Sequence, residues 1–199
     1  MRWPGKRKFE PYDVLRLDAA YLGGQEILAT PGSASFEKRR IRDVVPDGAV
    51  GVGAFAGIAQ AIFKGAAVEI RYEGRVRRNR REQVQFGFDI PREHSGYAVR
   101  CGDRAAVVAH YGWFTADAKT LDLTTVLDQA NEIPSPIKIV RTSELIEYAP
   151  VRIAGADFLL PKSSELTIYH PEGSVARNRL VFENCREFKG ESRVSFEGR

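Results

Sequence analysis

The chain has 199 residues, of which 43% are hydrophobic and 28% are charged, a balance that is typical of a globular protein and excludes a disordered or membrane-embedded chain. Its 30 Lys and Arg residues against 26 Asp and Glu residues give a formal net charge of +4, which is too small to identify an anionic partner without a shaped patch. We predict a single domain over residues 1–199, because this length can bury a sizeable core.

Targeting signals and cysteines leave the cellular compartment open. The N-terminus is basic, as in a signal peptide, but charged residues from Glu10 to Asp18 interrupt the apolar segment that should follow, so no export signal is visible. The longest run of low polarity, residues 48–63, is shorter than the roughly 20 residues that a spanning helix requires. Cys101 and Cys185 fit either two buried thiols or one disulfide.

Apolar and polar residues alternate through most of the chain, which is the pattern of strands with one wet face. Residues 68–72 alternate Val, Ile and Tyr with charged residues, and residues 83–90 place apolar side chains from Val84 to Ile90 opposite polar ones. The protein is therefore predicted to be mainly β. The same period of two recurs at Leu15 and Leu17, Leu121 and Leu123, Leu166 and Ile168, Leu180 and Phe182, and Val194 and Phe196.

Short turn signals separate these runs, and they favour hairpins over crossover helices. We therefore predict an antiparallel meander and not a parallel α/β sheet. The turn signals stand at Gly23–Gly24, Glu73–Gly74, Gly102–Asp103, Asp117–Thr120, Ala154–Gly155, Pro171–Gly173 and Lys189–Gly190.

One stretch, residues 47–65, combines glycines with a helical spacing of apolar residues. Apolar side chains at positions 52, 55, 59 and 62 follow one helix face, and Gly65 stands where a C-terminal cap belongs. The glycines at 51, 53 and 57 have the spacing of a phosphate-binding loop, but no buried strand precedes them and no acidic residue follows at the distance that a dinucleotide site requires. We predict a helix over residues 50–63 and no bound nucleotide.

A sheet that is apolar on one face needs a cover, and the predicted helix can supply it. The predicted fold class is therefore mainly β with one long helix (α+β). In this fold a curved antiparallel meander sheet forms an open half-barrel wrapped around the helix.

No pattern in the chain indicates catalysis or metal binding. The histidines at positions 94, 110 and 170 lack partners at the spacings of known metal motifs, and a loop or a strand end explains each of them. Carboxylate pairs such as Glu144 with Glu147, or Glu183 with Glu187, meet only if the fold brings them together. We predict no enzymatic activity, no catalytic residue, no metal site and no cofactor.

The densest basic run is RVRRNRR, residues 75–81. Its arginines can bind phosphates without reading a base sequence, but no aromatic residue lies between them to stack on bases. Because the run lies between two predicted strands, we favour a solvated hairpin tip over a nucleic-acid site. The arginines of this basic patch are Arg75, Arg77, Arg78, Arg80 and Arg81.

Two segments resemble known proteins. Residues 111–126, YGWFTADAKTLDLTTV, resemble the strand, Asp-x-x-Thr turn and strand segment that is common in the lipoprotein-carrier (LolA-like) superfamily. Residues 152–196 resemble the C-terminal part of a family of uncharacterised bacterial secreted proteins, in which a G-x-x-F-L-L-P strand, an acidic S-E-L strand and an N-R-x-x-F strand follow in this order. The resemblance extends more loosely to residues 13–28 and to the predicted helix.

This resemblance implies a LolA-like fold, in which an apolar concavity between sheet and helix shelters acyl chains, and a periplasmic or envelope location. Because this chain starts without a signal, two alternatives stay open: an upstream part with a signal peptide or early strands is missing, or the protein stays in the cytoplasm. The residues that would line the concavity would equally fill an ordinary core, and we favour a packed core. These residues are Phe55, Ile58, Ile62, Val84, Phe86, Phe88, Leu166, Ile168 and Leu180.

From these features we expect a non-enzymatic envelope protein that binds a lipid or a lipidated partner. Two other functions stay open, namely a structural or protein-interaction module on the same fold and a weak nucleic-acid binder that uses the basic hairpin. The sequence identifies neither the ligand nor the oligomeric state.

Overall fold

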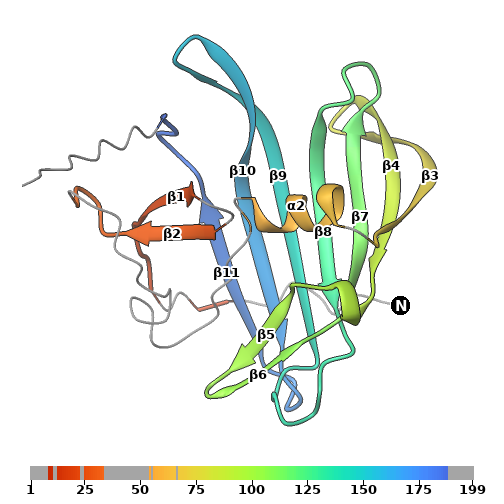
Figure 1. Cartoon of the computed structure of the whole chain (residues 1–199), viewed down its shortest axis with the longest axis vertical. Helices are drawn as coiled ribbons and strands as arrows, with labels where there is room; N and C mark the ends of the chain where they lie inside the picture. The colour runs from red at the N-terminus through yellow and green to blue at the C-terminus, as the bar shows by residue number, and fades with distance from the viewer. Residues whose placement is uncertain are drawn as a thin grey trace, which may run out of the picture.

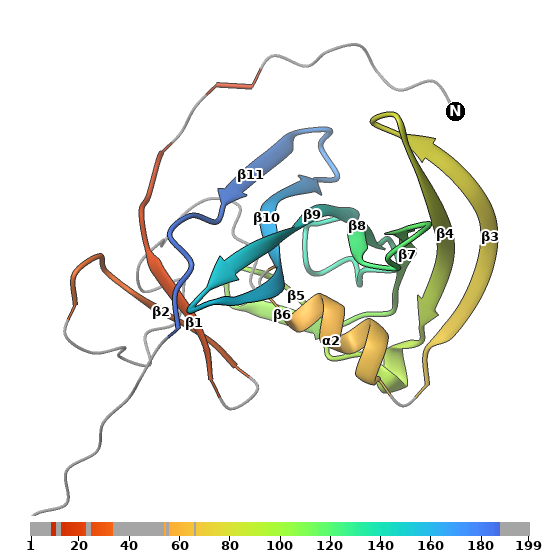
Figure 2. The same ribbon diagram turned by 90° about the horizontal axis from the view of Figure 1, so that it is seen from above.

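A computed structural model describes residues 9–10, 13–22, 25–33, 54, 56–65 and 67–187. Its main feature is an antiparallel sheet of seven strands, in the order β11-β10-β9-β8-β7-β4-β3. The sheet curves, and a helix, α2, lies on its concave side (Figures 1 and 2). The prediction of a mainly β fold with a helix is confirmed.

The large sheet is a meander with one insertion. Strands that follow one another in the chain are paired throughout, except that the short helix η1 and the two-stranded sheet β5–β6 lie between β4 and β7 in the sequence. The strands of the large sheet are β3 (Glu69–Arg78), β4 (Arg81–Ile90), β7 (His110–Asp117), β8 (Leu123–Ala130), β9 (Arg141–Ile153), β10 (Ala156–Tyr169) and β11 (Val175–Val181). The insertion holds η1 (Arg92–His94), β5 (Ala98–Cys101) and β6 (Arg104–Val107), and near the N-terminus β1 (Asp18–Leu22) pairs with β2 (Gln25–Ala29).

Most of the predicted turns connect paired strands. The signals at Gly102–Asp103, Asp117–Thr120, Ala154–Gly155 and Pro171–Gly173 each join two antiparallel strands, so these predictions are confirmed. In the β7–β8 turn, Oδ1 of Asp117 accepts hydrogen bonds from the backbone N–H groups of Lys119 and Thr120. The signals at Gly23–Gly24 and Lys189–Gly190, like the strand around Val194 and Phe196, lie outside the described residues.

Two local predictions are wrong. Glu73–Gly74 is not a turn but a bulge inside β3, where the register with β4 shifts between Tyr72 and Gly74 and Gly74 adopts a φ of 115°. The strand expected around Leu15 and Leu17 begins only at Asp18, because its partner β2 ends opposite Asp18.

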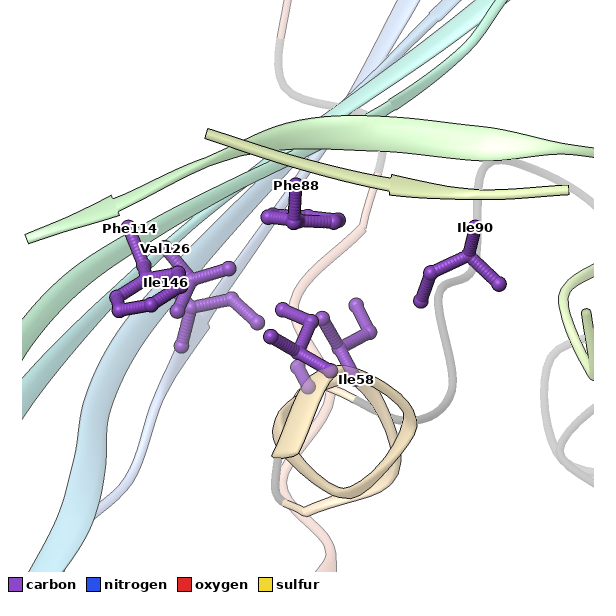
Figure 3. Packing of buried hydrophobic residues seen from close by; sticks show 8 residues of the cluster. Ile58, Phe88, Ile90, Phe114, Val126 and Ile146 are labelled. Carbon is purple, nitrogen blue, oxygen red and sulfur yellow. The ribbon is translucent and has the colours of Figure 1, made fainter. Parts of the chain in front are cut away.

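The helix packs onto the middle of the sheet and forms the main core with it. α2 (Gly57–Lys64) ends at Lys64 with Gly65 as its C-terminal cap, as predicted. The helix predicted over residues 50–63 begins only at Gly57, because Ala54 and Ala56 lie in turns, while residues 50–53 and 55 lie outside the described part of the chain. Ile58 points from α2 toward the buried residues of the sheet (Figure 3), and Ile62 of the same helix belongs to the same cluster, which includes residues of four strands. This helix core consists of Ala54, Ile58, Ile62, Phe88, Ile90, Phe114, Val126 and Ile146.

A second core lies under the inserted strands. It joins Val99 and Val108 to Ala130 of β8 and to two isoleucines of the β8–β9 connection, Ile137 and Ile139. The concave face is therefore covered at one end by the β5–β6 segment and in the middle by α2. None of the helices among the described residues has the length and apolar character that a membrane span needs. Cys101 and Cys185 are both free thiols.

Candidate functional site

The residues predicted to line a concavity fill the core instead. Ile58, Ile62 and Phe88 belong to the helix core, and Phe86 and Leu180 pack against it. Leu166 is buried, and Ile168 packs against the second core. Val84 is half-buried beside Arg75 of β3, and Phe55 lies outside the described residues. The alternative of a packed core therefore describes the space between α2 and the sheet.

An apolar surface nevertheless stays exposed beside the helix, on the concave side of β3 and β4. Four aromatic rings form a row that runs from α2 to the edge of the sheet: Phe63 meets Phe114 at a centroid distance of 5.0 Å, Phe114 stacks on Phe86 at 5.1 Å, and Phe86 meets Tyr72 at 5.5 Å. Both ends of this aromatic row are open to solvent, with 50% of Phe63 and 61% of Tyr72 exposed. Ile70, two residues before Tyr72, is 45% exposed.

The basic patch occupies the β3–β4 hairpin, as the sequence predicts. Asn79 and Arg80 form its turn, and both have positive φ, as a two-residue hairpin turn of the right-handed twist requires. The guanidinium of Arg78 lies 4.2 Å from the ring centroid of Trp113. Arg75 forms an ion pair with Glu82 at 3.8 Å.

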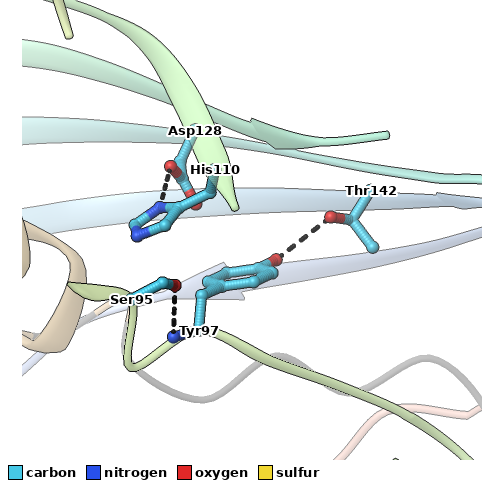
Figure 4. Close-up of polar contacts among 5 residues, drawn as sticks. All are labelled: Ser95, Tyr97, His110, Asp128 and Thr142. Atoms are coloured by element: carbon cyan, nitrogen blue, oxygen red, sulfur yellow. Dashed lines mark hydrogen bonds and ion pairs between the residues drawn. The ribbon is translucent and has the colours of Figure 1, made fainter. Parts of the chain in front are cut away.

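The sequence did not predict a buried polar cluster around His110 and Asp128 (Figure 4). The His110 ring contacts Phe88 of the helix core and Tyr97, which packs against the second core. Nδ1 of His110 and Oδ1 of Asp128 are 2.7 Å apart, and the side chains are 1% and 0% exposed. The ring of Tyr97 stacks on His110 at 5.1 Å, and its hydroxyl is 3.2 Å from the hydroxyl of Thr142. The insertion between β4 and β7 thus supplies Tyr97 as the cover of the pair.

A second buried carboxylate stands next to this pair. Glu144 of β9 lies directly opposite Asp128 of β8 in the register, so the two carboxyl groups share the concave face. Glu144 is 2% exposed and accepts a hydrogen bond of 2.6 Å from the Ser164 hydroxyl. Glu147, the partner considered for Glu144 from the sequence, lies three residues along β9 and instead accepts a hydrogen bond from Ser163.

Burial controls the ionisation of this cluster. Loss of solvation raises the pKa of the Asp128 carboxyl, and the hydrogen bond with His110 opposes this shift. Burial also raises the pKa of the Tyr97 hydroxyl, and the charge of Asp128 adds to it. Within the described residues, Nε2 of His110 and Oδ2 of Asp128 have no hydrogen-bond partner. The arrangement can hold one proton between an imidazole and a carboxylate in the protein interior.

Replacing Asp128 with asparagine should remove a pH dependence of stability. Because the pKa of Asp128 is raised in the folded state, the folded protein keeps this proton above pH 3.8, where the unfolded carboxyl loses it. The contribution is complete below that pH and is lost as the pH rises through the folded pKa. We expect the wild type to lose stability against Asp128→Asn as the pH rises from 3.8 to the raised folded pKa, by at most ~1.4 kcal/mol per pH unit.

Urea unfolding of both proteins at several pH values measures this difference. The matched control is Asp122→Asn, since Asp122 is exposed in the β7–β8 turn. A gap between wild type and Asp128→Asn that stays constant with pH would contradict the assignment.

A groove of about 580 Å³ reaches the edge of the polar cluster at His110. It lies where β3 begins and β4 ends, and Glu69, Asp89 and Glu132 give it an acidic rim. Arg71 pairs with the first two of these carboxylates, at 3.3 and 2.5 Å. No group of three or more potential metal ligands occurs among the side chains that the structure describes.

The period of two contained a signal for the polar cluster. Phe114 and Ala116 are buried, and counting back along β7 in steps of two places His110 on the same face. Asp128 stands in the same way between buried Val126 and Ala130. A charged residue in phase with core positions indicates a buried polar group, and only the pairing of strands shows which partner it meets.

Comparison of the chain with protein-family models, with curated proteins and with solved structures finds no match.

Proposed function

We propose that the protein binds the hydrocarbon part of a lipid or of a lipidated partner, and that it does so on the concave side of β3 and β4. The observation that carries this proposal is the aromatic row with its exposed ends at Phe63 and Tyr72, next to exposed Ile70. Covering a fully exposed side chain of this size with hydrocarbon contributes about 1.5–3 kcal/mol, so three half-exposed ones supply a few kcal/mol toward binding.

The proposed binding place differs from the one that the resemblance implies. The space beneath α2 is filled by Ile58 and Ile62, so an acyl chain would lie beside the helix and not under it. The proposal includes the relation to the LolA-like superfamily and an envelope location. Both rest on the resemblance of residues 111–126 and 152–196, and the strand, turn and strand of β7 and β8 are in keeping with the first segment.

Native mass spectrometry with monomeric C12 amphiphiles tests the proposal. We expect the wild type to form a stoichiometric adduct, and the variant Ile70→Ser/Tyr72→Ser to bind at least about tenfold more weakly, because each change removes apolar contact area. Both residues are exposed, so the fold should tolerate the substitutions.

Val181→Ser is the matched control, because Val181 is 68% exposed and lies on β11, at the opposite end of the sheet. Absence of an adduct with every amphiphile, whatever its headgroup, would overturn the proposal. An apo protein whose self-association is abolished by Ile70→Ser/Tyr72→Ser would assign the surface to protein interaction instead.

A further inference from the structure

The bulge in β3 changes which side chains reach the concave face. Before it, Ile70 and Tyr72 stand opposite Phe88 and Phe86 of β4. After it, Arg75 stands opposite Val84 and Arg77 opposite Glu82. These four β4 residues are spaced two apart, so their side chains lie on the same face of the sheet. Directly opposite residues share a face, and the four β3 residues therefore lie on that face as well.

In an uninterrupted strand, Gly74 and then Val76 would follow Tyr72 on this face, because every second residue points to the same side. The extra residue Glu73 shifts the phase, so that Arg75 and Arg77 follow Tyr72 on the concave side. This face of β3 therefore changes from apolar to cationic within a few residues. Arg75 and Tyr72 stand opposite Val84 and Phe86, two residues apart on β4, so at roughly 3.3 Å per residue Arg75 lies about 7 Å beyond Tyr72 along the strand.

Other arginines of the region are directed elsewhere. Arg78 stacks on Trp113, and Arg71 pairs with Asp89 and Glu69. The ion pair of Arg75 with Glu82 is long and open to solvent, with 68% and 74% of the side chains exposed, and such a pair holds its partners weakly. Arg75 can therefore exchange Glu82 for another anion.

We propose that this face of β3 binds a single anionic lipid molecule, a deepening that rests on the proposed function. The hydrocarbon lies along Ile70, Tyr72 and Phe86, and the carboxylate or phosphate headgroup accepts hydrogen bonds from Arg75 and Arg77. A guanidinium presents paired N–H donors that match the oxygens of either group. The positive charge beside the apolar residues thus favours an anionic lipid as the ligand.

The test compares two amphiphiles that share a C12 chain and carry opposite charges, dodecanoate and dodecyltrimethylammonium, each kept monomeric. We expect the wild type to bind dodecanoate at least about tenfold more tightly. In Arg75→Gln/Arg77→Gln this preference should fall to within about twofold, while affinity for the cationic amphiphile stays the same or rises.

Arg152→Gln is the matched control, because Arg152 is 67% exposed and pairs with exposed Asp157 in the β9–β10 hairpin. It should keep the full preference for dodecanoate. Circular dichroism of each variant verifies that it is folded, and the comparison of the two amphiphiles on the wild type needs no variant.

The outcomes separate the two proposals. Equal binding of both amphiphiles overturns the headgroup assignment and leaves the apolar site in place. Binding of neither overturns both proposals, and a dimer of the wild type that Ile70→Ser/Tyr72→Ser disperses would then assign the surface to a second copy of the chain. A preference for dodecanoate that survives Arg75→Gln/Arg77→Gln overturns the role of these two arginines.

Discussion

Replacing Phe88 with alanine should lower the free energy of unfolding by about 3–5 kcal/mol, the largest loss that we expect from any single truncation in the helix core. The ring is 0% exposed and lies between the isoleucines of α2 and the strands β7 to β9. Removing it leaves a cavity that closes only if the helix moves closer to the sheet. Equilibrium unfolding in urea measures the loss.

The space that the Phe88 ring occupies depends on a glycine in β7. Gly112 stands directly opposite Phe88, and a methyl group at position 112 would lie 3.2 Å from Cζ of that ring and against the carbonyl oxygen of Leu127. Since no side chain is present there, the ring fills the space. Val181→Ala, at a site that is 68% exposed, is the control. If Phe88→Ala lowers the free energy of unfolding by less than about 1 kcal/mol, the close packing of α2 against the sheet described above would be wrong.

Replacing His110 with phenylalanine should destabilise the protein by about 3–5 kcal/mol near neutral pH, because it leaves the carboxylate of Asp128 buried without its partner. Phenylalanine preserves the aromatic contact with Tyr97, so the loss reports the polar pair and not the packing. The hydrogen bond with His110 lowers the pKa of Asp128 against the effect of burial. Without it the folded pKa rises further.

This raised pKa fixes the sign of the pH dependence. The variant should be closest to the wild type at acidic pH, below the folded pKa of Asp128, and should fall behind as the pH rises. Unfolding at about pH 4 and pH 8 measures the difference, and His110→Phe/Asp128→Asn, which has no carboxyl to ionise, should lose most of the pH effect. An equal loss for His110→Phe at both pH values would contradict a buried ionisable pair.

The period of two and the turn signals predict the strands and their antiparallel meander, but not the register of each pair. It places Phe86 and Phe88 on the concave face and the basic run at a hairpin tip, and both placements are those of the structure. Local composition suffices here because each strand carries its own apolar face, and the helical spacing of positions 52, 55, 59 and 62 identifies the cover, whose buried residues are Ile58 and Ile62.

What the sequence could not predict depends on contacts between distant segments. Asp128 and Glu144 become neighbours only through the register of β8 with β9, and Tyr97 reaches His110 only because the insertion folds over the sheet. Glu73–Gly74 has the composition of a turn, yet pairing with β4 continues through it as a bulge. In each case the register between paired strands determines which residues become neighbours, and a short stretch of sequence does not specify that register.

The order of the strands also bears on how the chain folds. Neighbouring strands of the large sheet are joined by connections of at most ten residues, apart from β4 and β7, between which residues 91–109 intervene. Short loops close at a lower entropic cost and rapidly, so the ribbon β7 to β11 and the hairpin β3–β4 can each form from contacts local in sequence. The ladder between β4 and β7 is the step that brings them together, and it also completes the surface on which α2 and Tyr97 dock. Cooperative folding therefore depends on this junction together with α2, which contacts β4 as well as β7, β8 and β9.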